Sequence, residues 1–153
     1  SWGSGHRIIN GMINVGVNGE QYTPILQKFK KAGKKVGCVT TVPITHATPA
    51  GFCVTSKRRN AMDHIAEQYA ELNFDVMMGG GSQYFDKDKR KDKKDVFDLF
   101  VKKGYTVAKT KSEIPKSFCP YKTLSLLHPS PWRFTAITRT IQGIPPFLTV
   151  PPA

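Results

Sequence analysis

A histidine and several hydroxyl side chains follow an apolar, β-branched run in the stretch VGCVTTVPITHATPAGF, Val36 to Phe52. Residues two apart in an extended loop point the same way, so His46 and Thr48 can face one ligand. An imidazole nitrogen and a hydroxyl oxygen can both contribute to a divalent-metal shell, although Mg²⁺ also prefers carboxylates and waters. Thr45 could contribute only if the backbone turned. A loop histidine taken alone is more often structural or simply exposed, and that alternative stays open.

A basic stretch, TSKRRN, follows at residues 55–60. A helix that begins at Pro49 would run into it. The planar fork of arginine matches two phosphate oxygens, which makes this stretch a candidate phosphate site. Neighbouring residues on a helix point about 100° apart, so at most one of Arg58 and Arg59 would reach a given ligand. The alternative is an exposed basic helix end.

Three consecutive glycines, Gly79 to Gly81, can adopt positive φ and let the backbone approach another segment closely. They lack the GxxxxGK[ST] pattern of a phosphate-binding P-loop. The sequence also contains neither GxSxG nor HExxH. The acidic residues near these candidate loops are Asp63, which suits a helix start, and Asp75, which we expect in a strand. A metal site built from this chain alone would therefore be short of carboxylates.

The elements that must position these residues follow one pattern, a helix, a tight turn and a strand, three times over. The predicted pairs are a helix between Thr23 and Gly33 with a strand at 35–41, a helix between Asn60 and Asn73 with a strand at 74–78, and a helix between Asp95 and Gly104 with a strand at 105–108. This pattern predicts an α/β domain with a mostly parallel sheet covered by helices on both faces. The carboxyl ends of such strands share the edge where ligands bind, and both the Thr-His-Ala-Thr stretch and the triple glycine fall there.

The pattern stops near residue 114. Residues 114–153 contain no Asp or Glu and carry eight of the eleven prolines. We therefore divide the chain into an α/β domain at 1–113 and an irregular, Pro-rich tail at 114–153.

The composition narrows the class further. The 153 residues can form one domain, and the formal charge of +12 would suit anionic partners. The run DKDKRKDKKD, Asp86 to Asp95, alternates acids with bases, and we interpret it as solvated surface. No apolar run approaches the roughly 20 residues that span a bilayer. The chain starts at Ser1 without a methionine or a signal peptide, so we expect the native N-terminus to be absent.

Several of these stretches together resemble the bacterial branch of the alkaline phosphatases. They are VGCVTTVPITHATPAGF, RRN, AEQYAE, DVMMGGG and QYF, with INGMINVG resembling the segment after that family's nucleophile. The resemblance covers about residues 1–113. It implies a partial alkaline-phosphatase-like sandwich from a periplasmic or secreted enzyme, which in full length can be a homodimer.

The resemblance also implies roles for three residues. His46 and Thr48 match the pair that helps to form the family's third metal site, usually Mg²⁺, beside two zinc ions. Arg59 matches the arginine that grips the substrate phosphate, and its neighbour Arg58 should point elsewhere. Family enzymes hydrolyse phosphate monoesters through a phosphoserine intermediate.

The chain departs from the family in ways that predict an inactive fragment. The Asp-Ser-Ala motif of the nucleophile does not occur in it, and the zinc ligands of the family have no counterpart. The tail does not match the expected continuation, which suggests a changed reading frame in the source gene. We therefore expect a phosphatase fragment that is inactive alone.

Two other classes stay open. The first is a basic, non-catalytic module that binds polyanions or nucleic acid, which the charge motivates. The aromatic residues count against nucleic acid, because they fall on apolar helix and strand positions and not among bases; they are Tyr69, Phe74, Phe97 and Phe100. The second is a partly folded remnant whose sheet has open edges.

Overall fold

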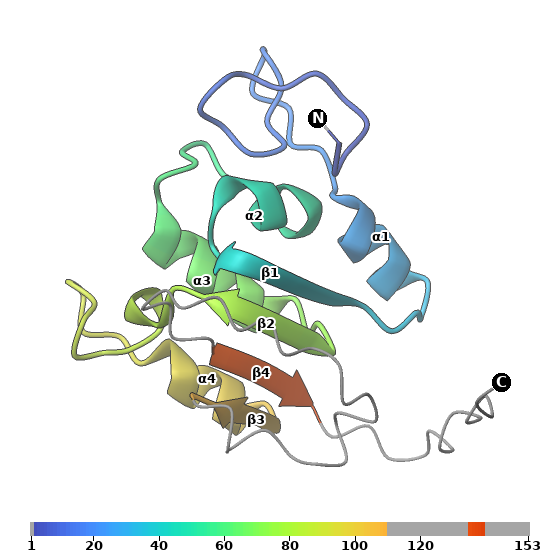
Figure 1. Ribbon diagram of the computed structural model, residues 1–153. Helices are drawn as coiled ribbons and strands as arrows, with labels where there is room; N and C mark the ends of the chain where they lie inside the picture. The colour runs from blue at the N-terminus through green and yellow to red at the C-terminus, as the bar shows by residue number, and fades with distance from the viewer. Residues whose placement is uncertain (1, 110–134, 140–153) are drawn as a thin grey trace, which may run out of the picture.

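The three helix–strand pairs that the sequence pattern predicts are all present along the chain. The structure is a computed structural model, and it describes residues 2–109 and 135–139. In order, the elements are α1 (Ile25–Lys31), β1 (Gly37–Pro43), α2 (Ala47–Cys53), α3 (Met62–Glu71), β2 (Val76–Gly80), the 3₁₀ turn η1 (Ser82–Tyr84), α4 (Val96–Lys102), β3 (Tyr105–Ala108) and β4 (Thr135–Arg139). Figure 1 shows α3 and α4 behind the sheet, and α1 and α2 beside β1.

The strands form one sheet in the order β1-β2-β4-β3. β1 and β2 pair in parallel, while β4 pairs antiparallel with both β2 and β3. β1, β2 and β3 therefore run in the same direction, and only β4 opposes them. This arrangement confirms the predicted α/β class with its mostly parallel strands. The sheet is unclosed: β1 is an edge strand, and its Val39 is 62% exposed.

Local capping signals explain where the helices begin and end. The Asp95 carboxylate accepts a hydrogen bond from the backbone N–H of Asp98 and caps α4, as predicted. Gly33, Asn73 and Gly104 follow α1, α3 and α4 in the left-handed region, which satisfies the last carbonyls of each helix.

Two helix starts and two strand ranges differ from the prediction. Pro24, not Thr23, occupies the cap of α1, and Ala61, not Asn60, that of α3. β1 and β2 each begin two residues later than expected. Asp75 lies just before β2, where its carboxylate accepts hydrogen bonds from Lys30 and from the N–H of Val36, and its own N–H donates to the C=O of Val36. The pairing of β1 with β2 starts with Gly37 opposite Val76.

The core lies mainly between the sheet and the helices α3 and α4. The four aromatic residues weighed above are all buried in it: Tyr69, Phe74, Phe97 and Phe100. Phe100 stacks edge-on against Tyr105, and Phe85 stacks against Phe97. These rings stabilise the core, so they form no exposed platform for stacking nucleic-acid bases.

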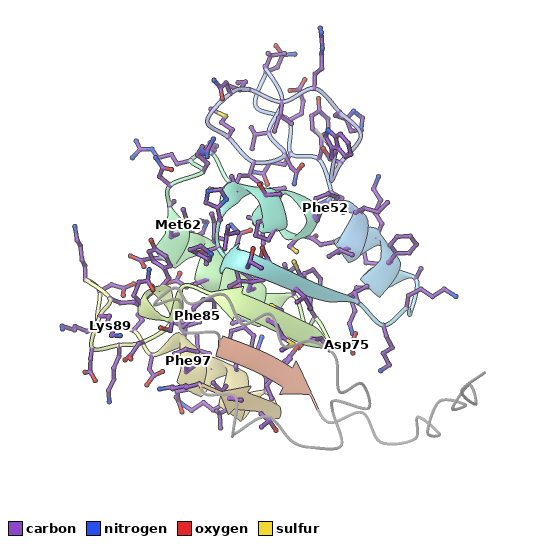
Figure 2. The ribbon with its side chains drawn as sticks, viewed as in Figure 1. Phe52, Met62, Asp75, Phe85, Lys89 and Phe97 are labelled. Carbon is purple, nitrogen blue, oxygen red and sulfur yellow. The ribbon has the colours of Figure 1, made fainter. Side chains whose placement is uncertain are left out.

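The charged run at 86–95 is not all solvated surface, and our interpretation was wrong at Arg90. The Arg90 side chain is fully buried and forms ion pairs with Glu67 and Asp92. The nearby Lys89 is exposed and extends away from the protein (Figure 2). Arginine rather than lysine occupies the buried position because its planar fork can donate five hydrogen bonds at once.

Most of the predicted tail lies outside the described residues, so its irregular character is untested there. Residues 135–139 are an exception, because they form β4. Within the two described ranges, no helix combines the length and the hydropathy needed to cross a membrane.

Candidate functional site

The turn between β1 and α2 carries the residues that the sequence singled out. His46 is the cap of α2, with extended backbone angles, and its C=O accepts the N–H of Ala50. The helix therefore begins at Ala47, before Pro49, and Thr48 is already helical. The extended-loop premise that aligned His46 with Thr48 was wrong, because residues two apart on a helix point about 200° apart.

The triple glycine packs against this turn. The backbone N–H of Ile44 donates to the C=O of Gly80, at 3.0 Å. Gly81 has φ +91°, and an added Cβ there would lie 3.0 Å from Pro43 Cβ. An added Cβ at Gly79 would lie 2.9 Å from Thr40 Cγ2. Both properties expected of these glycines, positive φ and close approach, are therefore confirmed, and they fix the turn at the carboxyl edge of the sheet.

Two polar atoms in this turn are buried without a partner among the described residues. They are the hydroxyl oxygen of Thr45 and Nδ1 of His46. A side chain of α3 fixes the turn, because the Tyr69 hydroxyl donates a hydrogen bond to the C=O of Ile44 at 3.0 Å. Burial raises the pKa of Tyr69 well above its ordinary value, so this hydroxyl stays protonated. The turn thus presents unsatisfied polar atoms on a fixed backbone.

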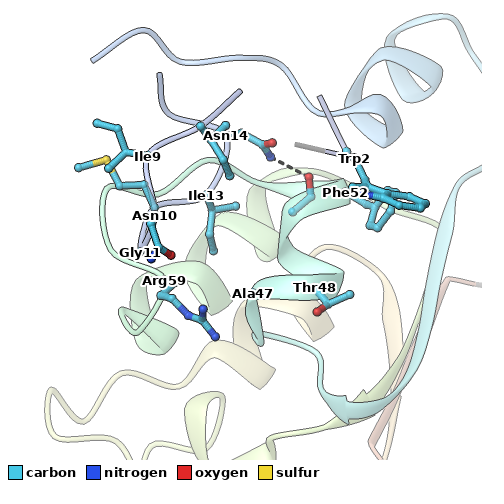
Figure 3. Close-up of a pocket in the computed structure, with 14 residues that line it drawn as sticks. Trp2, Ile9, Asn10, Gly11, Ile13, Asn14, Ala47, Thr48, Phe52 and Arg59 are labelled. Atoms are coloured by element: carbon cyan, nitrogen blue, oxygen red, sulfur yellow. Dashed lines mark hydrogen bonds between the residues drawn. The ribbon is translucent and has the colours of Figure 1, made fainter. Parts of the chain in front are cut away.

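A pocket of about 640 Å³ opens beside the start of α2. One wall comes from residues 2–14, which we call the N-terminal segment, and another comes from α2. Both Thr48 and Arg59 line the pocket (Figure 3). His46 is not among the lining residues. The structure therefore brings two of the three predicted site residues to one pocket and leaves the third beside it.

Asn14 joins the two walls of the pocket. Its side-chain amide donates to the carbonyl of Gly51 at 2.7 Å, as Figure 3 shows, and to the carbonyl of Val54 at 2.8 Å. Asn14 is buried and has φ +53°, a conformation that asparagine tolerates better than most residues. Gly3 also touches α2 so closely that an added Cβ would lie 1.9 Å from the carbonyl oxygen of Gly51. The N-terminal segment is thus packed onto α2.

Arg59 lies in the loop after α2, not on a helix. α2 ends at Cys53, so the predicted helical run into the basic stretch was wrong. Backbone hydrogen bonds hold this loop to the N-terminal segment: Ile13 and Ser56 exchange two, and the N–H of Arg59 donates to the C=O of Gly11. Arg58 lines a different pocket, so the two arginines point apart as predicted, although for a different geometric reason.

Arg59 is exposed and free to meet a ligand. In the part of the chain that the structure describes, no carboxylate pairs with its guanidinium. The pocket lining contains no Asp or Glu either. A cation without a counter-ion in a pocket free of acids favours an anionic ligand.

The two carboxylates that the sequence placed near the candidate loops lie in structural positions. Asp63 lies in the first turn of α3, as expected. Asp75 is buried and binds Lys30 at 2.7 Å and the N–H of Val36 at 2.9 Å. Burial by itself raises the pKa of Asp75, but these hydrogen bonds outweigh it and leave the pKa below its ordinary value. Asp75 is thus an ionised structural anchor and not a metal ligand.

The fit to a metal ion is therefore partial. Among residues 2–109 and 135–139, no three His, Cys, Asp or Glu side chains gather closely enough to hold one. The unpartnered Nδ1 of His46 and the exposed hydroxyl of Thr48 offer two donors at most. These donors fit a shell only if further ligands, carboxylates above all, come from elsewhere.

Sequence reasoning missed two contributors to the pocket, Asn14 and Gly11. Both lie in INGMINVG, which was noted only for its resemblance. The available signal was that asparagine and glycine, which often take positive φ, occur here outside any periodic element. What they contact could not be inferred, because α2 lies 37 residues from Asn14 along the chain.

Comparison with known proteins identifies a family that this chain resembles along most of its length. The family model described as alkaline phosphatase matches residues 1–127. Alkaline phosphatase 4 of Bacillus subtilis is 33% identical over 120 residues, which cover 74% of this chain and 25% of that protein. The crystal structure of Thermus thermophilus alkaline phosphatase is 41% identical, with a TM-score of 0.64, and covers 69% of this chain and 22% of that one.

A third similar protein is a mutant of TAB5 alkaline phosphatase, described with Mg bound in the M3 site. It is 33% identical, with a TM-score of 0.62, and the match covers 67% of this chain and 29% of that one. The chain thus spans about a quarter of the length of the relatives that it matches.

Proposed function

The chain belongs to the alkaline phosphatase family, and from this premise we propose that it supplies the phosphate-gripping part of a phosphomonoester hydrolase. The observation that carries the proposal is that Arg59, exposed and unpaired with any described carboxylate, lines the same pocket as Thr48. A guanidinium in that position can donate two parallel hydrogen bonds to a phosphate group.

We propose that His46 and Thr48 contribute two ligands to a metal site next to this pocket. The buried, unpartnered Nδ1 of His46 supports this role, and so does the Mg bound in the M3 site of the TAB5 mutant. A bound Mg²⁺ would stabilise negative charge on the phosphoryl oxygens, and the family resemblance adds two zinc ions. The remaining ligands must come from outside the described residues.

The phosphoserine step belongs to the same proposal, but this chain does not contain the Asp-Ser-Ala motif that the resemblance expects for it. We propose that the 153 residues alone bind phosphate and do not turn over phosphate esters. A periplasmic or secreted location, and a homodimer of the full-length enzyme, are further proposals that rest on the family.

The decisive test places the chain within a full-length relative. The matching 120-residue segment of the Bacillus subtilis relative is replaced by the corresponding segment of this chain, and hydrolysis of a chromogenic phosphate monoester is measured. We expect Arg59→Ala to lower kcat/KM on the order of a hundredfold, because it removes a charged donor to the transferring phosphoryl group.

One control and one further variant make the result specific. Lys31→Ala removes an exposed charge from α1, far along the chain, and should leave kcat/KM unchanged. His46→Ala should raise the Mg²⁺ concentration needed for half-maximal activity. If Arg59→Ala behaves like Lys31→Ala in an active chimera, the assignment of Arg59 is wrong.

A further inference from the structure

A second pocket, of about 570 Å³, shares no lining residue with the Arg59 pocket. One wall is formed by the cap residue Ala61 and by His64, Gln68 and Glu71 of α3, which recur at helical spacing and are exposed or half-buried. The facing wall is the loop at residues 55–58. Nothing in the proposed phosphatase function uses this pocket.

The charge in this second pocket is mainly positive. Lys57 and Arg58 line it and are exposed, and neither pairs with a carboxylate of the described residues. Among its lining residues only Glu71 is acidic. Glu71 is the last residue of α3, and its Cα lies about 15 Å along the helix axis from Ala61, at 1.5 Å per residue.

The positive end of the pocket is the end far from Glu71. The C=O of Arg58 accepts the N–H of Ala61, at 3.1 Å, which fixes Arg58 beside the start of α3. One turn further along the helix, His64 adds an imidazole that can donate a hydrogen bond. Lys57, Arg58 and His64 thus line the pocket near the N-terminal end of α3, whereas Glu71 lies at its C-terminal end.

The loop that carries the cations is held in place before any ligand arrives. Ser56 is buried, and its hydroxyl both donates to the C=O of Arg58 and accepts the N–H of Arg58, at 2.8 and 3.2 Å. The Gln68 side chain donates to the C=O of Thr55, at 2.8 Å, and ties the loop to α3. A ligand thus need not order the backbone, which reduces the entropic cost of binding.

From this arrangement we infer that the second pocket binds a phosphate-type oxyanion between Arg58, Lys57 and His64. The fork of Arg58 suits a tetrahedral oxyanion, and Lys57 adds a point charge. The inference goes beyond the proposed function and does not depend on it, because Arg58 and Arg59 line separate pockets. The oxyanion can be free phosphate or a phosphate group on a larger molecule.

The test is a titration of the 153-residue chain with inorganic phosphate at low ionic strength, followed by backbone amide NMR. We expect saturable shifts at residues 55–58 and 64, distinct from those at Gly11 and Thr48 in the Arg59 pocket. Phosphorylated serine is the second probe: affinity equal to that of inorganic phosphate indicates a site for the phosphate group alone, and tighter binding indicates a site for phosphorylated molecules.

The variants separate this site from the proposed catalytic one. Arg58→Gln should weaken binding at residues 55–58 on the order of tenfold, whereas Arg59→Gln should abolish only the shifts at Gly11 and Thr48. Arg58→Lys keeps the charge and should retain part of the affinity, and Lys31→Gln, a distant charge loss, should change nothing. Unaltered amide dispersion in each variant confirms the fold. The inference is overturned if residues 55–58 show no saturable shift, or if Arg58→Gln and Lys31→Gln weaken binding equally.

Discussion

Replacing Arg90 with methionine tests the buried cation that joins the charged loop to α3. The guanidinium uses all five of its donors. Nε donates to Asp92 Oδ1 at 2.8 Å, and Nη2 donates to Asp92 Oδ2 at 2.5 Å and to Glu67 Oε1 at 2.8 Å. Nη1 donates to the carbonyls of Tyr84 and Asp63, at 2.7 and 3.1 Å. Methionine fills a similar volume but donates nothing.

The size of the effect follows from what the substitution leaves behind. Removing one partner of a buried ion pair costs about 3–5 kcal/mol. Here the carboxylates of Asp92 and Glu67 are 38% and 26% exposed, so water can replace part of the lost interaction. The two carbonyls lose roughly 1 kcal/mol each. We therefore expect Arg90→Met to lower the free energy of unfolding by about 2–4 kcal/mol, a large part of the stability of a typical domain.

Urea denaturation at pH 7, followed by far-UV circular dichroism, measures this change. Lys91→Met is the matched control, because Lys91 is exposed and lies in the same loop. It should change the free energy of unfolding by less than about 0.5 kcal/mol. The argument fails if the two variants have the same stability.

The pH dependence gives a second readout. The hydrogen bond from Arg90 is the main cause that lowers the pKa of Asp92 to about 2. Because this pKa lies below the unfolded value of about 3.9, the carboxylate stabilises the fold above pH 4 and loses this effect as pH falls toward 2. The stability gap between wild type and Arg90→Met should narrow over that range, and NMR titration should find the Asp92 pKa raised in the variant.

Three further predictions concern the stability of the fold around the turn. Asp75→Asn should lower the free energy of unfolding by about 2 kcal/mol at pH 7, and by less at pH 3.5, because the lowered pKa of the carboxyl makes its contribution depend on ionisation; urea titrations at both pH values check this. Gly79→Ala should cost about 1–3 kcal/mol, because its Cβ would meet Thr40, whereas Gly51→Ala, helical and with open space around its Cβ, should gain up to about 1 kcal/mol; thermal unfolding of the pair compares them. Tyr69→Phe should cost about 1–2 kcal/mol by leaving a buried carbonyl unpaired, and a slightly lowered urea midpoint with an unchanged slope would be the signature.

Elements set by local chemistry could be predicted from the sequence. The cap at Asp95 and the strand at 105–108 match the prediction, because the cap, the apolar spacing and the closing glycine lie within a few residues of one another. The start of α2 could not be predicted in the same way. His46 is the cap of α2, and the turn before it is fixed by the hydrogen bond from the N–H of Ile44 to the C=O of Gly80. Gly80 lies in β2, far from this turn in the sequence.

Long-range partners account for the other failures. The burial of Arg90 depends on acceptors up to 27 residues away, which no local pattern reveals among so many lysines. β4 pairs between β2 and β3 although it comes last in the chain, so strand order could not be read from the sequence of elements. At the site, the residue types suggested the class of ligand. The sequence could not show that Thr48 and Arg59 share a pocket, because this depends on how the N-terminal segment packs.

The backbone hydrogen bonds between the N-terminal segment and the basic loop have a consequence for local opening. The amide hydrogens of Ile13, Ser56 and Arg59 can exchange with deuterium only when the two segments separate, so they should exchange at a common rate. Each separation of the two segments removes a wall of the Arg59 pocket and at the same time frees the loop that carries Arg59. A phosphate group would thus meet either the complete Arg59 pocket or no pocket at all. Bound phosphate would therefore slow the exchange of all three amide hydrogens in parallel.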